Sequence, residues 1–286
     1  MSVARKTSTY GIVARDAPTA VIFRRGPTRH TRLLCWDLRD DTIRAGQWLV
    51  GRVDPGPCGL SPSGDLLVYE ARKGTRTFTA ICRPPYFTAL AFWEYSSPWT
   101  GGGFFANDRT VVLGLTLEDP RAAGNFPAGF EVTDVWRYYA RGGSAPDRIA
   151  EVVAADPAAG QGWLRTGPDV FRKPNSARVR LHLVRTVAGR DERAYSILEE
   201  DRSPNAKTYD LGSVDWADWA PDGTLLFGQA GRLYRQPMPP SLTDPLERSS
   251  LVADLTDQSF ERIVAPDEAR HWPASARAAS KKSKRR

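Results

Sequence analysis

The stretch that decides the fold is Leu60-Ser61-Pro62-Ser63-Gly64-Asp65-Leu66-Leu67-Val68-Tyr69, which aligns without a gap to Trp219-Ala220-Pro221-Asp222-Gly223-Thr224-Leu225-Leu226-Phe227-Gly228. In both copies a proline pre-sets the backbone for a turn, and a glycine two residues later accepts the positive φ that a tight reversal needs. The apolar run that follows is typical of a buried strand. Each copy therefore predicts a strand, a tight turn and a second strand.

Weaker copies of the same pattern give the period of the repeat. Residues 105–114 carry Asn107-Asp108 at the turn, and residues 17–23 begin with Ala17-Pro18. The turn-exit positions 19, 65, 110 and 224 are separated by 46, 45 and 114 residues, and the last interval holds two units of 57. Only Gly167 to Phe171 marks the unit in between. Repeats of this length are typical of β-propellers, so five units are expected.

Further strands are predicted between the turns, at 32–38, 47–53, 77–83, 87–95, 131–139, 178–186, 194–199 and 231–236. Two or three extra strands per unit correspond to one propeller blade. The predicted fold is therefore all-β, a β-propeller of antiparallel four-stranded blades, with about five blades and with six or seven also compatible. The Ala-, Gly- and Pro-rich segments 118–130 and 145–162 are predicted loops or short helices inserted between strands.

The two matched segments resemble the S-P-D-G-x-x-L/I core of TolB-type, WD40-like propeller repeats. The stretch from Gly46 through Tyr69, followed by Arg83-Pro84-Pro85-Tyr86, also resembles a group of uncharacterised bacterial proteins. Ser63 stands where the repeat usually has Asp, and the third copy lacks both Pro and Gly. The resemblance implies a fold and a bacterial origin, and it implies no activity.

The positive charge is concentrated at the end of the chain. The formal net charge is +7, and residues 271–286 contribute +6 of it through Arg277, Lys281, Lys282, Lys284, Arg285 and Arg286. A nearly neutral body with a charged end predicts a propeller over residues 1–270 and a flexible, solvated basic tail over 271–286. The alternative is salt-dependent nucleic-acid binding through Lys281, Lys282, Lys284, Arg285 and Arg286.

The cellular location is predicted from two further features. No apolar run reaches the roughly 20 residues of a membrane helix, and no signal-peptide core follows Met1 to Tyr10. Cys35, Cys58 and Cys82 are odd in number and lie in strand-like segments, which favours buried structural thiols. A cytoplasmic protein is therefore expected, with no membrane association.

Catalytic, cofactor and metal motifs are absent from the sequence. The turn around Ser61 lacks the spacing of a nucleophile elbow, and His30, His182 and His271 lie on separate segments. Asp215 and Asp218 are the nearest carboxylate pair, but an odd separation on one strand points them to opposite faces. We therefore predict no cofactor and no metal site, and the sequence assigns no catalytic residues; a site in the central channel, built from residues far apart in sequence, stays open.

The segment around Arg83, Tyr86 and Trp99 has the most unusual composition, with prolines, aromatic residues and the run Gly101-Gly102-Gly103. Exposed aromatic side chains beside arginine are typical of protein-binding hot spots. Phe92 and Trp93 are expected in the blade core. We predict a monomeric, non-catalytic interaction scaffold that binds another protein through Arg83, Tyr86 and Trp99. An enzyme or a binder of sugar-like small molecules that uses the central channel is the alternative.

Overall fold

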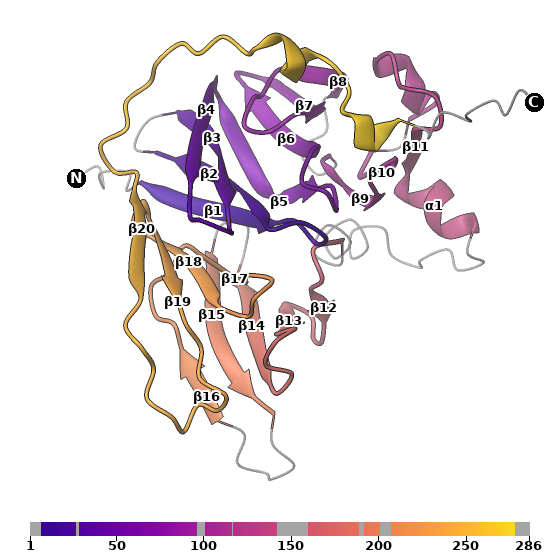
Figure 1. Cartoon of the computed structure of the whole chain (residues 1–286). Coiled ribbons are helices and arrows are strands. Elements are labelled where there is room, and N and C mark those ends of the chain that lie inside the picture. Colours follow the sequence, from indigo (N-terminus) through magenta and orange to yellow (C-terminus); the bar gives the residue numbers. More distant parts are fainter. Residues whose placement is uncertain are drawn as a thin grey trace, which may run out of the picture.

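The described part of the chain folds into five β-sheets, each made of strands that are consecutive in sequence (Figure 1). The computed structural model describes residues 7–26, 29–95, 101–115, 117–141, 160–188, 192–200 and 207–277. We name the sheets blades A to E in chain order. This arrangement is the all-β, five-bladed propeller that the repeat predicts.

Blades A, B and E are antiparallel four-stranded meanders. Blade A contains β1 (Ser8–Val13), β2 (Thr19–Arg25), β3 (His30–Asp37) and β4 (Ile43–Val50). Blade B contains β5 (Arg52–Leu60), β6 (Leu67–Lys73), β7 (Arg76–Cys82) and β8 (Ala89–Tyr95). Blade E contains β17 (Trp216–Trp219), β18 (Leu225–Gln229), β19 (Arg232–Gln236) and β20 (Ser250–Asp254).

Blades C and D depart from the predicted four antiparallel strands. Blade C has β9 (Gly103–Asn107), β10 (Thr110–Leu113) and β11 (Glu131–Asp134), and β11 runs parallel to β10 because a crossover with the 3-10 helix η1 (Pro120–Ala123) connects them. Blade D has the five antiparallel strands β12 (Leu164–Arg165), β13 (Val170–Pro174), β14 (Leu181–Ala188), β15 (Glu192–Glu199) and β16 (Lys207–Asp210). The sector without a clear repeat motif is thus the one with an extra strand.

The repeated turns occupy equivalent positions, between the first and second strand of each blade. The turn at Pro62 joins β5 to β6, and the turn at Pro221 joins β17 to β18. Gly64 and Gly223 have φ of +80° and +84°, which is the conformation that only glycine adopts without strain. The matched segments are therefore equivalent turns in two blades of one array.

The turns of neighbouring blades also bind each other. The amide of Asp16 donates to the carbonyl of Pro62 at 3.0 Å, which joins blade A to blade B. The amide of Ser63 donates to Oδ1 of Asp108 at 2.9 Å, which joins blade B to blade C. Each turn thus stabilises its own blade and fixes the position of the next.

The ring closes where blade E contacts blade A. Strand β1 packs against β17 and β18, and Gly11 leaves the room that the Trp216 ring occupies, since a Cβ on Gly11 would lie 2.4 Å from that ring. The amide of Thr9 donates to Oδ2 of Asp215 at 3.2 Å. First and last blades are therefore joined by close packing and by a hydrogen bond.

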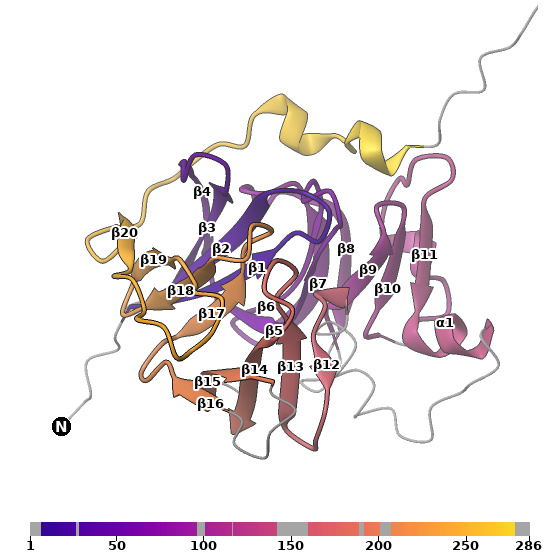
Figure 2. The ribbon, with the colours of Figure 1, turned by 60° about the horizontal axis from the view of Figure 1, so that its bottom comes forward.

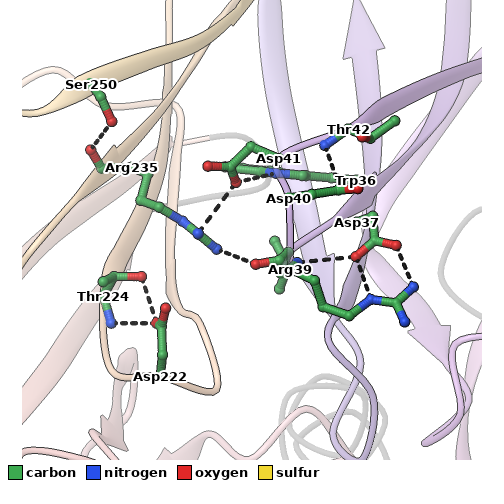
Figure 3. A network of polar contacts seen from close by, with 11 residues as sticks. Trp36, Asp37, Arg39, Asp40, Asp41, Thr42, Asp222, Thr224, Arg235 and Ser250 are labelled. Carbon is green, nitrogen blue, oxygen red and sulfur yellow. Dashed lines mark hydrogen bonds and ion pairs between the residues drawn. The ribbon is translucent and has the colours of Figure 1, made fainter.

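A polar network closes the same junction at the β3–β4 turn (Figure 3). Arg235 of β19 donates to the carbonyl of Leu38 at 2.8 Å and lies 3.4 Å from Oδ1 of Asp41. The same Asp41 oxygen accepts from the indole of Trp36 at 3.0 Å. Arg235 is partly buried, so solvent and salt screen this bridge between blades less than they screen a fully exposed ion pair.

The predicted strand 131–139 is correct only as far as Asp134. Helix α1 (Val135–Arg141) follows, because Oδ1 of Asp134 accepts from the amide of Arg137 at 2.9 Å and so caps the first turn. Tyr138 then packs against Phe104 of blade C. Of the predicted insertions, 118–130 contains η1, whereas residues 145–159 lie outside the described part of the chain.

After β20 the chain runs back across blades A and B towards blade C (Figures 1 and 2). We call residues 255–277 the C-terminal strap. It contains the 3-10 helices η2 (Asp267–Arg270) and η3 (Ala274–Ala276), and Ala276 is buried in the core shared by blades B and C. Residues 271–277 of the predicted tail thus pack against the propeller, while residues 278–286 lie outside the described residues. The boundary at 270 stays a prediction.

Candidate functional site

The predicted contact loop lies beneath the C-terminal strap. Arg83 and Tyr86 are both partly buried in the turn after β7, where the amide of Tyr86 donates to the carbonyl of Arg83 at 3.0 Å. The Arg83 guanidinium donates to the carbonyl of Glu268 at 2.6 Å and is 3.5 Å from that of His271. Trp99 lies outside the described residues. The polypeptide that Arg83 contacts is therefore a segment of its own chain.

The strap is held mainly through its main-chain carbonyls. Arg24 donates to the carbonyls of residues 255 and 256 at 3.0 Å each, and Gln47 donates to that of residue 263 at 3.0 Å. Arg83 adds its bond to residue 268 further along. Hydrogen bonds to main-chain carbonyls hold a polypeptide whatever its side chains are. This face of blades A and B thus binds the main chain of the strap.

Two strap residues, Phe260 and Trp272, fix the strap in register through aromatic contacts. The Phe260 ring stacks on His30 with centroids 4.6 Å apart and meets Trp48 at 6.2 Å. At the other end, Trp272 packs against Phe126 and Phe130 of the β10–β11 crossover, at 5.4 and 4.8 Å. Pairs of this geometry add about 0.5–1.5 kcal/mol each beyond the area that they bury.

Side-chain contacts complete the attachment. Arg32 forms an ion pair with Glu261, and the Ser275 hydroxyl donates to Oδ2 of Asp65 at 2.7 Å. Asp65 is the turn-exit residue of the blade B repeat. The strap therefore contacts a repeated turn as well as the blade edges.

Three apolar side chains are exposed on the strap or next to it: Phe260 and Val264 of the strap, and Val50 of β4. Val50 is the register partner of His30, on which Phe260 stacks, and Gln47 of the same strand β4 binds residue 263. Val264 is 73% exposed, and the other two are nearly half exposed. We call these three residues the strap patch.

Asp215 and Asp218 point to opposite faces of the chain at β17, as the sequence predicts. Asp215 accepts from the Thr9 amide of blade A, whereas Oδ1 of the buried Asp218 lies 2.6 Å from Nζ of Lys173 in blade D. The two carboxylates therefore do not form a glycosidase-like pair. Asp218 instead belongs to a charged group that sequence reasoning did not find.

The three histidines remain apart. His30 stacks on Phe260, Nε2 of His182 lies 3.3 Å from a Glu200 oxygen, and Nδ1 of His271 is 2.9 Å from the carbonyl of Asp267. Within the described ranges, no group of three or more His, Cys, Asp or Glu residues could hold a metal ion. No helix in that part of the chain is long and apolar enough to cross a membrane.

The cysteines are buried free thiols in one hydrophobic core. Burial raises the pKa of Cys35 to about 11 and raises the pKa values of Cys58 and Cys82 well above their ordinary range. A thiol whose pKa is raised in this way is a poor nucleophile at neutral pH.

Phe92 is the exception to the predicted core. Its side chain is exposed and lies against Phe78 with ring centroids 4.9 Å apart, whereas Trp93 is buried. Neighbours on a strand face opposite sides, so both rings could not enter the same core.

The comparisons with known proteins give no family. No protein-family model matches the chain, and no curated protein matches its sequence. Among solved structures, an uncharacterized protein from Listeria monocytogenes is 8% identical with a TM-score of 0.31, covering 90% of this chain and 85% of that chain.

Two further solved structures are similarly distant. The β-propeller domain of Cps50 (Swd1) from Myceliophteria thermophila is 13% identical with a TM-score of 0.27, over 87% of this chain and 73% of that one. TolB from Acinetobacter baumannii is 12% identical with a TM-score of 0.28, over 80% and 51%. The propeller assignment rests on the five sheets and their closure, and the resemblance to a bacterial group stays a prediction.

Proposed function

We propose that this protein is a non-catalytic interaction scaffold, and that the face bearing the C-terminal strap binds another protein. The proposal rests on the way in which the propeller holds the strap. Side-chain donors of blades A and B, led by Arg24, Gln47 and Arg83, are arranged along a line of main-chain carbonyls. A surface that binds extended chain in this way is suited to protein recognition.

The strap patch supplies the apolar part of such an interface. Val50 and Phe260 are exposed at the boundary between β4 and the strap, and Val264 is exposed four residues further along the strap, so burial by a partner releases water from their surfaces. Partly exposed charged groups, among them Glu261, border the patch and supply a polar rim. The partner that fits this surface presents an apolar segment flanked by polar groups.

The test uses the full chain as bait in extracts of the cells that produce it. Val264→Asp places a charge at the most exposed position of the strap patch, and Val179→Asp is the matched control, because Val179 is 76% exposed and lies on blade D. A partner that binds the patch is expected to be retained by the wild type and by Val179→Asp, and depleted at least about tenfold by Val264→Asp. Equal retention by all three baits, or no specific partner, would refute the proposal.

The contact residues predicted from sequence give a second comparison. Trp99→Ala is expected to weaken the same complex if residue 99 belongs to the interface. Deletion of residues 278–286 tests the basic tail, and loss of retention on nucleic acid at low salt is the expected result for nucleic-acid association. Neither variant alters a side chain that holds the strap, so each result reports on its own contact.

A further inference from the structure

A group of polar and charged side chains meets where blades A, D and E come together. We define the central cluster as Tyr10, Lys173, Arg185, Arg193, Tyr195 and Asp218. Arg185 and Tyr195 are register partners on β14 and β15, and Lys173 lies 2.6 Å from Asp218 of β17. Arg193 lies over the ring of Tyr10 at 5.0 Å. Blades A, D and E thus each contribute to one site.

The cluster lies towards the middle of the propeller. Tyr10 and Asp218 belong to the first strands of their blades, and the first strands β1, β5 and β17 are neighbours through β1. Arg193 also reaches blade B, since a Cβ on Gly56 would lie 3.3 Å from its Nη2 and 3.5 Å from Oδ1 of Asp54. Residues from four blades therefore surround the cluster.

Two members of the cluster are buried without a polar partner. Tyr195 is 1% exposed, and its hydroxyl has no hydrogen-bond partner among the described residues. Arg185 is 6% exposed, its Nε is likewise unpaired, and no described carboxylate forms an ion pair with it. Buried polar groups are almost always hydrogen-bonded, and two neighbouring exceptions call for an explanation.

The surrounding rings do not satisfy the Arg185 guanidinium. Its Cζ lies 4.5 Å from the Trp163 centroid and 4.7 Å from that of Phe171, so aromatic faces flank it. Such faces attract the charge, but they offer no oxygen to its N–H groups. Since Asp218 is already paired with Lys173, the acceptor that Arg185 lacks must come from elsewhere.

We propose that the central cluster binds a small oxyanion, a carboxylate or a phosphate, through Arg185 and Tyr195. The planar guanidinium donates to two oxygens of such an anion, and the Tyr195 hydroxyl donates to one of them. Lys173 and Arg193 add positive charge on the partly exposed side of the cluster, through which the anion enters. The site is independent of the strap face, and its ligand is a small molecule.

The test is calorimetric titration of the full chain with inorganic phosphate and, separately, with succinate, at constant ionic strength. Tyr195→Phe removes only the unpaired hydroxyl and is expected to weaken binding about tenfold, which corresponds to about 1.4 kcal/mol. Arg185→Met is expected to abolish binding, and Arg76→Met, at an exposed position of blade B, is the matched control that leaves it unchanged. Binding of phosphate alone or of succinate alone identifies the kind of anion.

Two results would overturn the inference: no heat of binding with either anion up to about 10 mM, or binding that Tyr195→Phe leaves unchanged. Tyr195→Phe decides the question even where Arg185→Met fails to fold, because loss of a hydroxyl without a partner does not disturb the core.

Discussion

Arg24 anchors the start of the C-terminal strap, and its replacement by methionine tests how the strap is held. The guanidinium donates at 3.0 Å to the carbonyls of Leu255 and Thr256, and it also bonds to the carbonyl of Gly26. Arg24 is 2% exposed and lies over the Trp48 ring at 5.4 Å. Methionine keeps much of the volume and removes all three donated hydrogen bonds.

The expected cost follows from the groups left behind. Each strap carbonyl that loses its donor while buried costs about 1–3 kcal/mol. Methionine avoids the burial of a charge, which offsets part of that cost. Leu255 is almost fully buried, so the strap cannot lift to hydrate the carbonyls without exposing it. We expect Arg24→Met to lower the free energy of unfolding by about 2–4 kcal/mol.

Urea denaturation measures the total change, and limited trypsin digestion measures the local one. Arg262 and Arg270 are exposed residues of the strap, so cleavage there is expected to accelerate in Arg24→Met. Arg76→Met is the control, because the side chain of Arg76 is largely exposed and its pair with Glu94 is worth little. An unfolding free energy within about 0.5 kcal/mol of wild type, together with unchanged cleavage, would refute the anchoring role.

Two further predictions concern titrating groups. Alkylation of Cys35, Cys58 and Cys82 at pH 8 is expected to be at least about 100-fold slower in the folded protein than in urea, because burial raises the pKa of Cys35 to about 11 and raises the pKa values of the other two well above their ordinary range. Mass spectrometry counts the labels, and rapid labelling of the folded chain would contradict the burial of the thiols. Hydrogen bonds from the side chain and amide of Arg39 lower the pKa of Asp37 to about 2. The stability that Asp37 contributes is therefore complete above its ordinary pKa of about 4 and is lost as the pH falls towards 2. Asp37→Asn is expected to flatten the fall in urea midpoint across that window, and parallel curves for variant and wild type would exclude the contribution.

The propeller could be predicted from sequence because its signals are local. Pro62 and Gly64 fix one turn by their own backbone preferences, and Pro221 and Gly223 fix another in the same way. The spacing of such turns then counts the blades. Blade D could be predicted only in part, because the apolar run after the turn at Pro168 is just Val170-Phe171 before Arg172 and Lys173 follow.

Helix α1, the exposure of Phe92 and the course of the strap could not be predicted from the repeat. Helix α1 was predicted as strand because Trp136, Tyr138 and Tyr139 favour strands, although Asp134 is a capping residue three positions before Arg137. Phe92 was placed in the core, although its alternation with Trp93 on one strand signals the opposite face. The strap could not be predicted, because the blades bind it mainly through its main-chain carbonyls, and such bonds require no particular side chains along it.

The positions where the sequence reasoning fails are also the positions with the strongest indications of function. Residues of the repeated turns are constrained by backbone geometry and by the core, and every blade needs them. A buried Arg185 whose Nε has no hydrogen-bond partner does not stabilise the fold. Burying its charge costs free energy, and a well-packed apolar side chain would not have that cost. Proteins depart from local consistency chiefly at functional sites. The central cluster and the strap patch both include residues outside the repeated turns. Variants at these two places are therefore expected to change binding without unfolding the propeller.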